Sequence, residues 1–164
     1  MIPPHSRIAS PAVDIWGGEA NMLRDILVGS AVCVFNIVIH AWLTVATIRA
    51  ARLLADRKTI RPWRYLVAIM IATVLMLMAA HILEVFVWAG VYALVHAAPD
   101  GADLVYFAFV NYATLGYGDI VPVAEWRLLG PMASMNGILL FGWSTAVIFE
   151  VLRKALSRDE SLAD

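Results

Sequence analysis

The chain has 164 residues, of which 62% are hydrophobic and 15% are charged, and its mean hydropathy is +0.77. A soluble domain of this length carries more charge and fewer apolar residues, so the composition indicates one compact integral membrane protein. The net charge of −1 gives no reason to expect a nucleic-acid partner, and the single Cys33 excludes an intrachain disulfide.

The amino-terminal part of the chain is predicted to be a loop followed by a membrane helix. Residues 1–25 mix prolines, glycines and charges, and they lack the basic run and apolar core of a signal peptide. Residues 26–48 are apolar and would be about 34 Å long as a helix, enough to cross a bilayer. Arg49 follows directly, and we expect an amino-terminal transmembrane helix over residues 26–50.

Two further apolar segments are long enough to span a membrane. Residues 65–95 predict a helix longer than the bilayer requires, with Trp88 and Tyr92 at its far interface. Residues 128–152 predict the third spanning helix, and the short charged tail 153–164 is expected to begin as helix.

Between these segments lies a stretch that is too short to span. Residues 96–101 form a cluster of turn-favouring residues, and residues 103–113 are apolar and aromatic but too few to cross a bilayer. We therefore expect a re-entrant helix, so that the fold class is an all-α membrane protein with three transmembrane helices.

The distribution of charge predicts the orientation. Nine of the twelve Lys and Arg residues lie in residues 49–64 or 153–158, which places these segments in the cytoplasm and the amino terminus outside. We therefore expect a multi-pass protein of the inner membrane with a cytoplasmic carboxyl terminus. The outer side would carry seven acids, which would concentrate cations there: Asp14, Glu19, Asp25, Asp100, Asp103, Asp119 and Glu125.

The polar stretch Thr114-Leu-Gly-Tyr-Gly-Asp119 follows the expected re-entrant helix. Bare backbone at membrane depth is costly unless it is buried in protein or lines a water-filled path. The glycines on either side of Tyr117 permit backbone conformations that a Cβ disfavours, and such alternation can turn successive carbonyl oxygens toward one axis. A ring of carbonyls from several chains can replace the hydration shell of a cation.

This stretch is similar to the selectivity-filter signature of potassium channels, with Leu115 where Val or Ile is commoner. The resemblance covers residues 65–152 and is to the bacterial type of pore domain with one pore loop per chain. It implies an outer helix at 65–95, a pore helix at 103–113, a filter at 114–119 and an inner helix at 128–152. One filter strand per chain implies a homotetramer, with the amino-terminal helix outside this core.

The resemblance also implies roles for individual residues. Residues Thr114, Leu115, Gly116 and Tyr117 would coordinate K⁺, and Gly118 would complete the filter. Among the supporting residues, Asp119 would be braced by an aromatic of the pore helix, where Tyr106 and Phe107 match and only Tyr106 has a donor.

The sequence departs from the family pattern at two positions. Ala113 stands where a second Thr is usual, and Val110 where some relatives have a carboxylate behind the filter. Both changes remove bracing hydrogen bonds, which leaves open how strictly the filter would select.

The inner helix has candidate positions for bending and for lining the cavity. Gly137 matches the family's bend position, although close helix packing accounts for it equally well, and packing is the favoured role of Gly142. Residues Ile138, Phe141 and Thr145 recur at helical spacing, so they share a face that the resemblance places on the cavity.

Polar residues inside the apolar segments form two further candidates. His81 and Glu84 lie one turn apart on the second helix, and Asn36 and His40 form a similar pair on the first. A metal site of His40, His81 and Glu84 is one possibility. Counting from the expected cytoplasmic ends opposes it, because His40 would lie about 12 Å deep and His81 about 24 Å deep.

Glu84 and the histidines can also serve the protein without a metal. Hydrogen bonding between helices, for example from Glu84 to Ser30, is the favoured role. Alternatively Glu84 reaches Asn111 or Tyr112 of the pore helix and supports the filter in place of the missing carboxylate at Val110.

The sequence therefore predicts a potassium-selective channel made of four copies of the chain in lipid, with K⁺ as permeant ion and no cofactor. The alternatives are a weakly selective cation channel, a silent modulatory subunit or, less favoured, a membrane metal sensor. No paired acid and base or nucleophile suggests an enzyme. The first helix lacks the regularly spaced arginines of voltage sensors, and nothing indicates the gating stimulus.

Overall fold

A computed structural model describes residues 15–55 and 62–160, with side chains for residues 21–50 and 63–157. Its elements are α1 (Ile15–Ala55), α2 (Pro62–Leu94), α3 (Leu104–Tyr112), a short 3₁₀ turn η1 (Ala124–Trp126) and α4 (Leu129–Glu160). The described residues contain no strand, which confirms the all-helical prediction.

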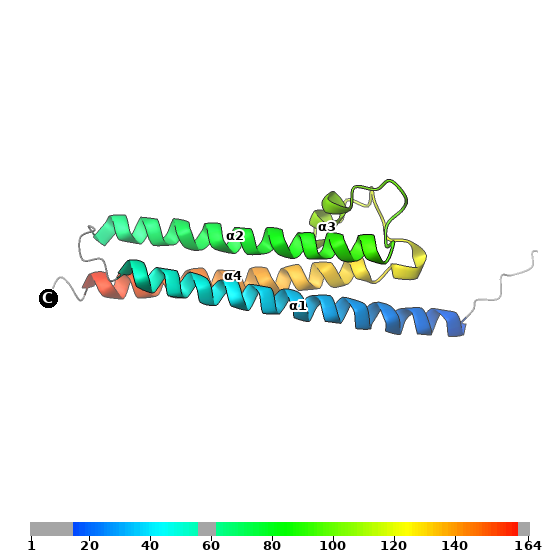
Figure 1. The fold of residues 1–164 in the computed structure, drawn as a ribbon, viewed down its shortest axis with the longest axis horizontal. Coiled ribbons are helices and arrows are strands. Elements are labelled where there is room, and N and C mark those ends of the chain that lie inside the picture. Colours follow the sequence, from blue (N-terminus) through cyan, green and yellow to red (C-terminus); the bar gives the residue numbers. More distant parts are fainter. Residues whose placement is uncertain (1–14, 56–61, 161–164) are drawn as a thin grey trace, which may run out of the picture.

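The three long helices lie side by side, and α3 lies against α2 at one end of the bundle (Figure 1). Three segments are long and apolar enough to cross a membrane: Asn21–Ala50, Trp63–Leu94 and Ala124–Ser157. The helix α3 has only nine residues and cannot span. The predicted membrane architecture of three spanning helices is confirmed.

The helix α1 is longer than expected at both ends. It has 41 residues and already includes residues 15–25, which were expected to be a loop, while residues 1–14 lie outside the described part. Its early start is stabilised by contacts with the segment that leads into α4, where Asp25 is 2% exposed and accepts a hydrogen bond from the Leu128 amide at 3.3 Å. The neighbouring Arg24 donates to the Glu125 carbonyl at 2.5 Å.

The ends of the other two long helices also differ from the prediction. The helix α2 begins at Pro62 and ends at Leu94, and α4 continues through most of the expected tail, to Glu160. Arginines do not end a helix, because Arg is itself a good helix former. Charge therefore marked where the apolar segments stop rather than where the helices stop.

One face of α1 is buried and unusually polar. Its polar members recur at helical spacing and pack toward α2 and α4, whereas Phe35 and Trp42 on other faces are 55% and 74% exposed. Polar groups are costly in lipid, so they face the inside of a bundle. Among residues 21–50, whose side chains are described, the buried polar residues of α1 are Asp25, Asn36, His40, Thr44 and Thr47.

Two aromatic residues of α2 are placed differently from the prediction. Trp88 and Tyr92 were expected at the membrane interface, but both are fully buried. The Trp88 indole donates to the Asn136 amide oxygen at 3.0 Å, and the Tyr92 hydroxyl donates to the Leu129 carbonyl at 3.4 Å. Both polar tips therefore find partners on α4, so neither needs water.

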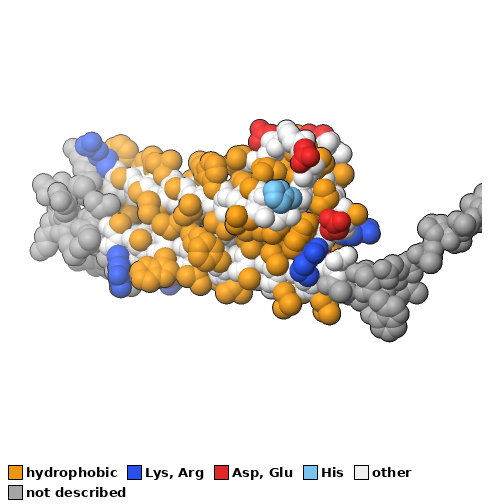
Figure 2. Space-filling view, turned by 45° about the vertical axis from the view of Figure 1, so that its right-hand side comes forward, with side chains coloured by type: hydrophobic (Ala, Val, Ile, Leu, Met, Phe, Trp, Pro, Cys, Tyr) orange, Lys and Arg blue, Asp and Glu red, His pale blue; other side chains and the backbone are white. Residues whose placement is uncertain are grey.

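Acidic side chains gather at the end of the molecule that carries α3, while hydrophobic side chains cover the long sides (Figure 2). Four of the acids there, Asp100, Asp103, Asp119 and Glu125, are exposed. Asp25 does not contribute to this surface, because it is buried against α4. The expected acidic outer surface is therefore smaller than the sequence suggested.

Candidate functional site

The short helix α3 is held in place at both ends. At its start, the Asp103 carboxylate accepts hydrogen bonds from the Val105 and Tyr106 amides at 3.1 and 3.0 Å, which caps the helix. At its end, the Ser134 hydroxyl of α4 donates to the Asn111 carbonyl at 2.6 Å. These contacts fix the direction in which the chain leaves α3.

The loop that follows α3 has an alternating backbone. The φ angles of Thr114, Gly116 and Gly118 are 61°, 57° and 76°, whereas the residues between them have negative φ. Positive φ costs glycine little, but it is strained for the β-branched Thr114. The strain at Thr114 is offset locally, because the Thr114 amide donates to the Asn111 carbonyl at 2.9 Å.

The outer part of this loop is tied back to α3. The Tyr106 hydroxyl donates to Asp119 Oδ2 at 2.7 Å, and this hydrogen bond lowers the pKa of Asp119 and raises that of Tyr106. Phe107 turns the other way, where it is buried with its ring 4.9 Å from that of Tyr92. Within the chain, all of residues 114–119 are exposed.

The carboxyl end of α3 rests directly on α4 at Gly137. A Cβ added to Gly137 would lie 2.0 Å from the Tyr112 carbonyl oxygen, so only glycine permits this approach. Gly142 has nothing within 4 Å of its Cβ position, so it does not serve packing between the described helices of one chain. The structure thus gives Gly137 a packing role, and its role as a hinge stays a prediction.

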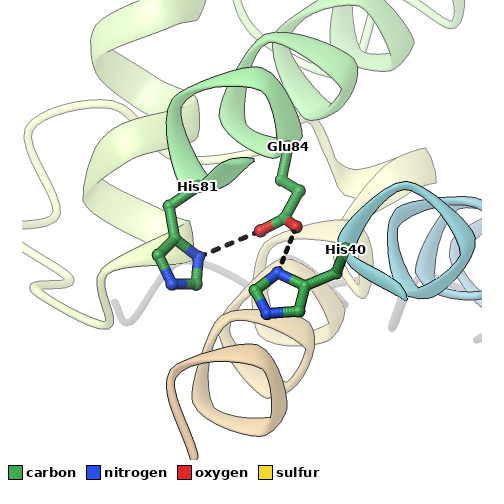
Figure 3. Close-up of side chains that lie close together, drawn as sticks. All are labelled: His40, His81 and Glu84. Atoms are coloured by element: carbon green, nitrogen blue, oxygen red, sulfur yellow. Dashed lines mark hydrogen bonds and ion pairs between the residues drawn. The ribbon is translucent and has the colours of Figure 1, made fainter. Parts of the chain in front are cut away.

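Behind α3 lies a polar cluster made of His40, His81, Glu84, Tyr112 and Ser144. The Glu84 carboxylate is hydrogen-bonded to His40 Nδ1 at 2.8 Å and to His81 Nδ1 at 3.0 Å (Figure 3). It also accepts a hydrogen bond from the Tyr112 hydroxyl. The Ser144 hydroxyl lies 2.9 Å from His81 Nε2 and 3.3 Å from His40 Nε2. All four helices α1 to α4 contribute to this cluster.

The expected depths of the two histidines were wrong. His40 lies 15 residues before the end of α1 at Ala55, and His81 lies 19 residues after the start of α2 at Pro62. These distances correspond to about 22 Å and about 28 Å of helix, which brings the two side chains to similar depth. The error arose because the helix ends were placed where the apolar segments stop.

The partner of Glu84 on α3 is Tyr112, and neither Asn111 nor Ser30 bonds to Glu84. The backbone carbonyl of Asn111 accepts a hydrogen bond from the Ser134 hydroxyl, but the side-chain Nδ2 of Asn111 has no partner among the described residues. The structure therefore leaves Asn111 without the contact to Glu84 that was considered for it. Only Tyr112 links the carboxylate to the end of α3.

Sequence reasoning missed a second polar layer next to the cluster. The Asn36 amide donates to the Asn136 side chain at 2.9 Å, and Trp88 donates to the same oxygen at 3.0 Å. Asn136 and Ser144 are eight residues apart on α4, which puts them on one helix face. Asn36 and His40 were identified because they are polar residues at helical spacing within an apolar segment. The same criterion applied to α4 would have identified Asn136 and Ser144.

The residues predicted to line the cavity from α4 do not all face open space. Ile138 is 60% exposed, whereas the Phe141 ring turns back to the polar cluster and lies 4.6 Å from the ring of His81. Together with Thr145, Phe141 lines a cavity of about 420 Å³ between α2, α3 and α4. Phe141 therefore packs against its own chain as well as bordering open space.

Comparison with known proteins gives one family match. Residues 80–154 match a family model described as "Ion channel". The comparison with curated proteins and the comparison with solved structures gave no match. The matched residues contain α3, the alternating loop, the carboxyl half of α2 and most of α4. Residues 80–154 are therefore similar to the sequences of an ion-channel family.

Proposed function

We propose that the protein is a potassium-selective channel whose filter is formed by residues 114–118. The observation that carries this proposal is the alternation of positive φ at Thr114, Gly116 and Gly118 directly after a short, capped, re-entrant helix. Such a backbone can direct a row of carbonyl oxygens to one side, which is the chemistry that replaces the water around K⁺. Residues Thr114, Leu115, Gly116 and Tyr117 would supply these oxygens.

The proposal requires several copies of the chain around one axis. One chain contributes one filter strand, and a dehydrated cation needs oxygens on all sides. The exposure of Leu115 and Tyr117, which are 53% and 65% exposed in a single chain, is consistent with a surface that other copies cover. We therefore propose a homotetramer in lipid, with α2 and α4 around the axis and α1 outside them.

Electrostatics support cation conduction. Exposed acids lie at the α3 end of the molecule (Figure 2), and the lowered pKa of Asp119 keeps that carboxylate ionised. The carboxyl end of α3, with its partial negative charge, leads into the filter. The orientation in the membrane follows from the concentration of Lys and Arg toward the opposite end of the chain's bundle. The α3 end and the amino terminus would lie outside, and the carboxyl end of α4 in the cytoplasm.

Two features bear on how strictly the filter selects. The buried Val110 side chain is apolar, so it provides no hydrogen bond behind the filter, and the Ala113 side chain provides none from the end of α3. The Tyr106 to Asp119 bond and the Glu84 to Tyr112 bond support the loop from two sides instead. A weakly selective cation channel or a silent modulatory subunit is the alternative, and the missing hydrogen bonds at Val110 and Ala113 favour it.

The deciding experiment measures ion flux and stoichiometry on one preparation. The purified protein is reconstituted into liposomes or planar bilayers, and reversal potentials are recorded with K⁺ on one side and Na⁺ on the other. We expect a reversal potential close to that of K⁺, and a mass in nanodiscs that corresponds to four chains. Equal permeability to both ions would remove the claim of selectivity, and a monomer or dimer would remove the proposed filter.

The contact between Glu84 and Tyr112 gives this channel a candidate gating element. We expect Glu84→Gln and Tyr112→Phe to change the open probability more than the single-channel conductance, because neither residue lines the proposed filter. Unchanged gating in both variants would show that this contact serves only to pack the helices.

A further inference from the structure

The polar cluster behind the filter contains more ligand chemistry than helix packing requires. His40, His81 and Glu84 present ligand atoms that all lie within 4.8 Å of one another, in the buried centre of the four helices (Figure 3). We propose that these three side chains bind one divalent transition-metal ion of the zinc class.

The donor set suits such an ion. Two imidazole nitrogens and one carboxylate are ligands that zinc binds readily. Zinc-to-ligand bonds of about 2.0–2.2 Å place two ligand atoms on one ion about 3.3 Å apart. The Glu84 oxygens now lie 2.8 and 3.0 Å from the two Nδ1 atoms, so the ligands need only small shifts to accept the ion.

Hydrogen bonding around the ligands supports the same occupant. If both Nδ1 atoms donate to Glu84, both Nε2 atoms become acceptors, and the single proton of the Ser144 hydroxyl between them satisfies only one. If a metal binds both Nδ1 atoms, both Nε2–H groups donate to the two lone pairs of Ser144. Metal-bound histidines usually have their second nitrogen held in this way.

Charge also calls for a cation at this position. Glu84 is fully buried, and its ion-pair partners in the described part of the chain are the two histidines alone. A buried carboxylate without a positive partner is costly. A metal ion supplies that positive charge, and a proton shared by the two imidazoles is the competing occupant that the experiment must separate.

A path to the site is present. The His81 side chain is 16% exposed and lines the 420 Å³ cavity together with Tyr112 and Ser144. The site would join α1 to α2 through metal ligands and to α3 and α4 through Tyr112 and Ser144. It thereby gives the amino-terminal helix a specific task, which is to close a metal site behind the pore helix.

The test measures metal content and not ion flux, so it is independent of the proposed channel function. The full chain is purified without a histidine tag, freed of metal with a chelator, and titrated with Zn²⁺ and Co²⁺ at neutral pH. We expect one ion per chain, visible absorption of tetrahedral Co²⁺, and a higher melting temperature with Zn²⁺.

Variants locate the ion. His81→Ala is the decisive variant because His81 is the partly exposed ligand, and it should lose stoichiometric binding while still folding. His40→Ala and Glu84→Gln should lose binding in their folded fraction. Ser144→Ala should weaken binding about 10–100-fold, as loss of a hydrogen bond to a metal ligand does. His96→Ala is the matched control, because this exposed histidine lies outside the cluster and should bind as the wild type does.

Three results of the binding measurements would overturn the proposal. They are a folded wild type that takes up less than one ion per chain at saturation, undiminished binding in His81→Ala, and equal loss of binding in His96→Ala. A stability that changes with pH but not with zinc or cobalt would identify a proton as the occupant, and would equally overturn it.

Discussion

Replacing Gly137 by alanine tests how α3, the proposed pore helix, is supported. The glycine faces the Tyr112 carbonyl, and an added Cβ would lie 2.0 Å from that oxygen, whereas real Cβ contacts essentially never fall below 3.0 Å. The obstacle is backbone and cannot rotate away, so α3 and α4 must separate by about 1 Å or more.

The cost can be estimated from two opposing effects. Overpacking of this kind costs about 1–3 kcal/mol. Alanine recovers about 1 kcal/mol through its higher helix propensity. Because the obstacle is rigid, we expect a cost near the upper limit and a net loss of about 2 kcal/mol per chain. The displaced Tyr112 lies two residues before Thr114, so the proposed filter loop should shift and selective flux should fall.

The matched control is Gly142→Ala on the same helix, where nothing lies within 4 Å of the added Cβ. This variant should be neutral or up to about 1 kcal/mol more stable. Thermal unfolding of both variants in nanodiscs, followed by flux in liposomes, makes the comparison. Equal stability of the two variants would refute the packing role. Altered gating of Gly137→Ala at unchanged stability would instead indicate the hinge that the resemblance implies.

Three further predictions concern the proposed filter, its support by Tyr106, and the contact of Asp25. Gly116→Ala should abolish selective flux while membrane insertion remains, because alanine at φ 57° costs about 1–2 kcal/mol in each of several chains. Gly90→Ala is the control, because Gly90 lies at an open helical position. Normal selectivity in Gly116→Ala would exclude this stretch as the filter. Tyr106→Phe should raise the pKa of Asp119 toward its ordinary value, because the lost hydrogen bond lowers it. The contribution of this hydrogen bond to stability is present at neutral pH and is lost as pH falls through the lowered pKa of Asp119. The variant should therefore lose activity at a higher pH than the wild type. Identical pH profiles of activity would contradict this. Asp25→Ala should destabilise the protein by about 1 kcal/mol, because it removes a buried acceptor of the Leu128 amide, whereas Asp25→Asn should retain most of the stability. Equal melting temperatures for the wild type and both variants would show that this hydrogen bond contributes nothing.

Much of the architecture could be predicted from composition and local pattern. Apolar segments of sufficient length identify spanning helices, because lipid requires every backbone polar group to be satisfied within the segment. The two glycines around Tyr117 indicated an unusual backbone, because positive φ is a local property of glycine. The partner of Asp119 could be chosen in the same way, since Tyr106 was the candidate with a hydroxyl.

The sequence by itself determined which segments cross the membrane, where the loop with the unusual backbone lies, and which aromatic residue could bond to Asp119. Only the tertiary structure decided which polar residues meet. His40 and Glu84 are 44 residues apart, and their contact depends on the relative depth of two helices whose ends extend beyond the apolar segments. The burial of Trp88 likewise depends on Asn136 of another helix. Sequence periodicity specifies the face on which a residue lies, whereas the partner across the bundle is set by how the helices pack against one another.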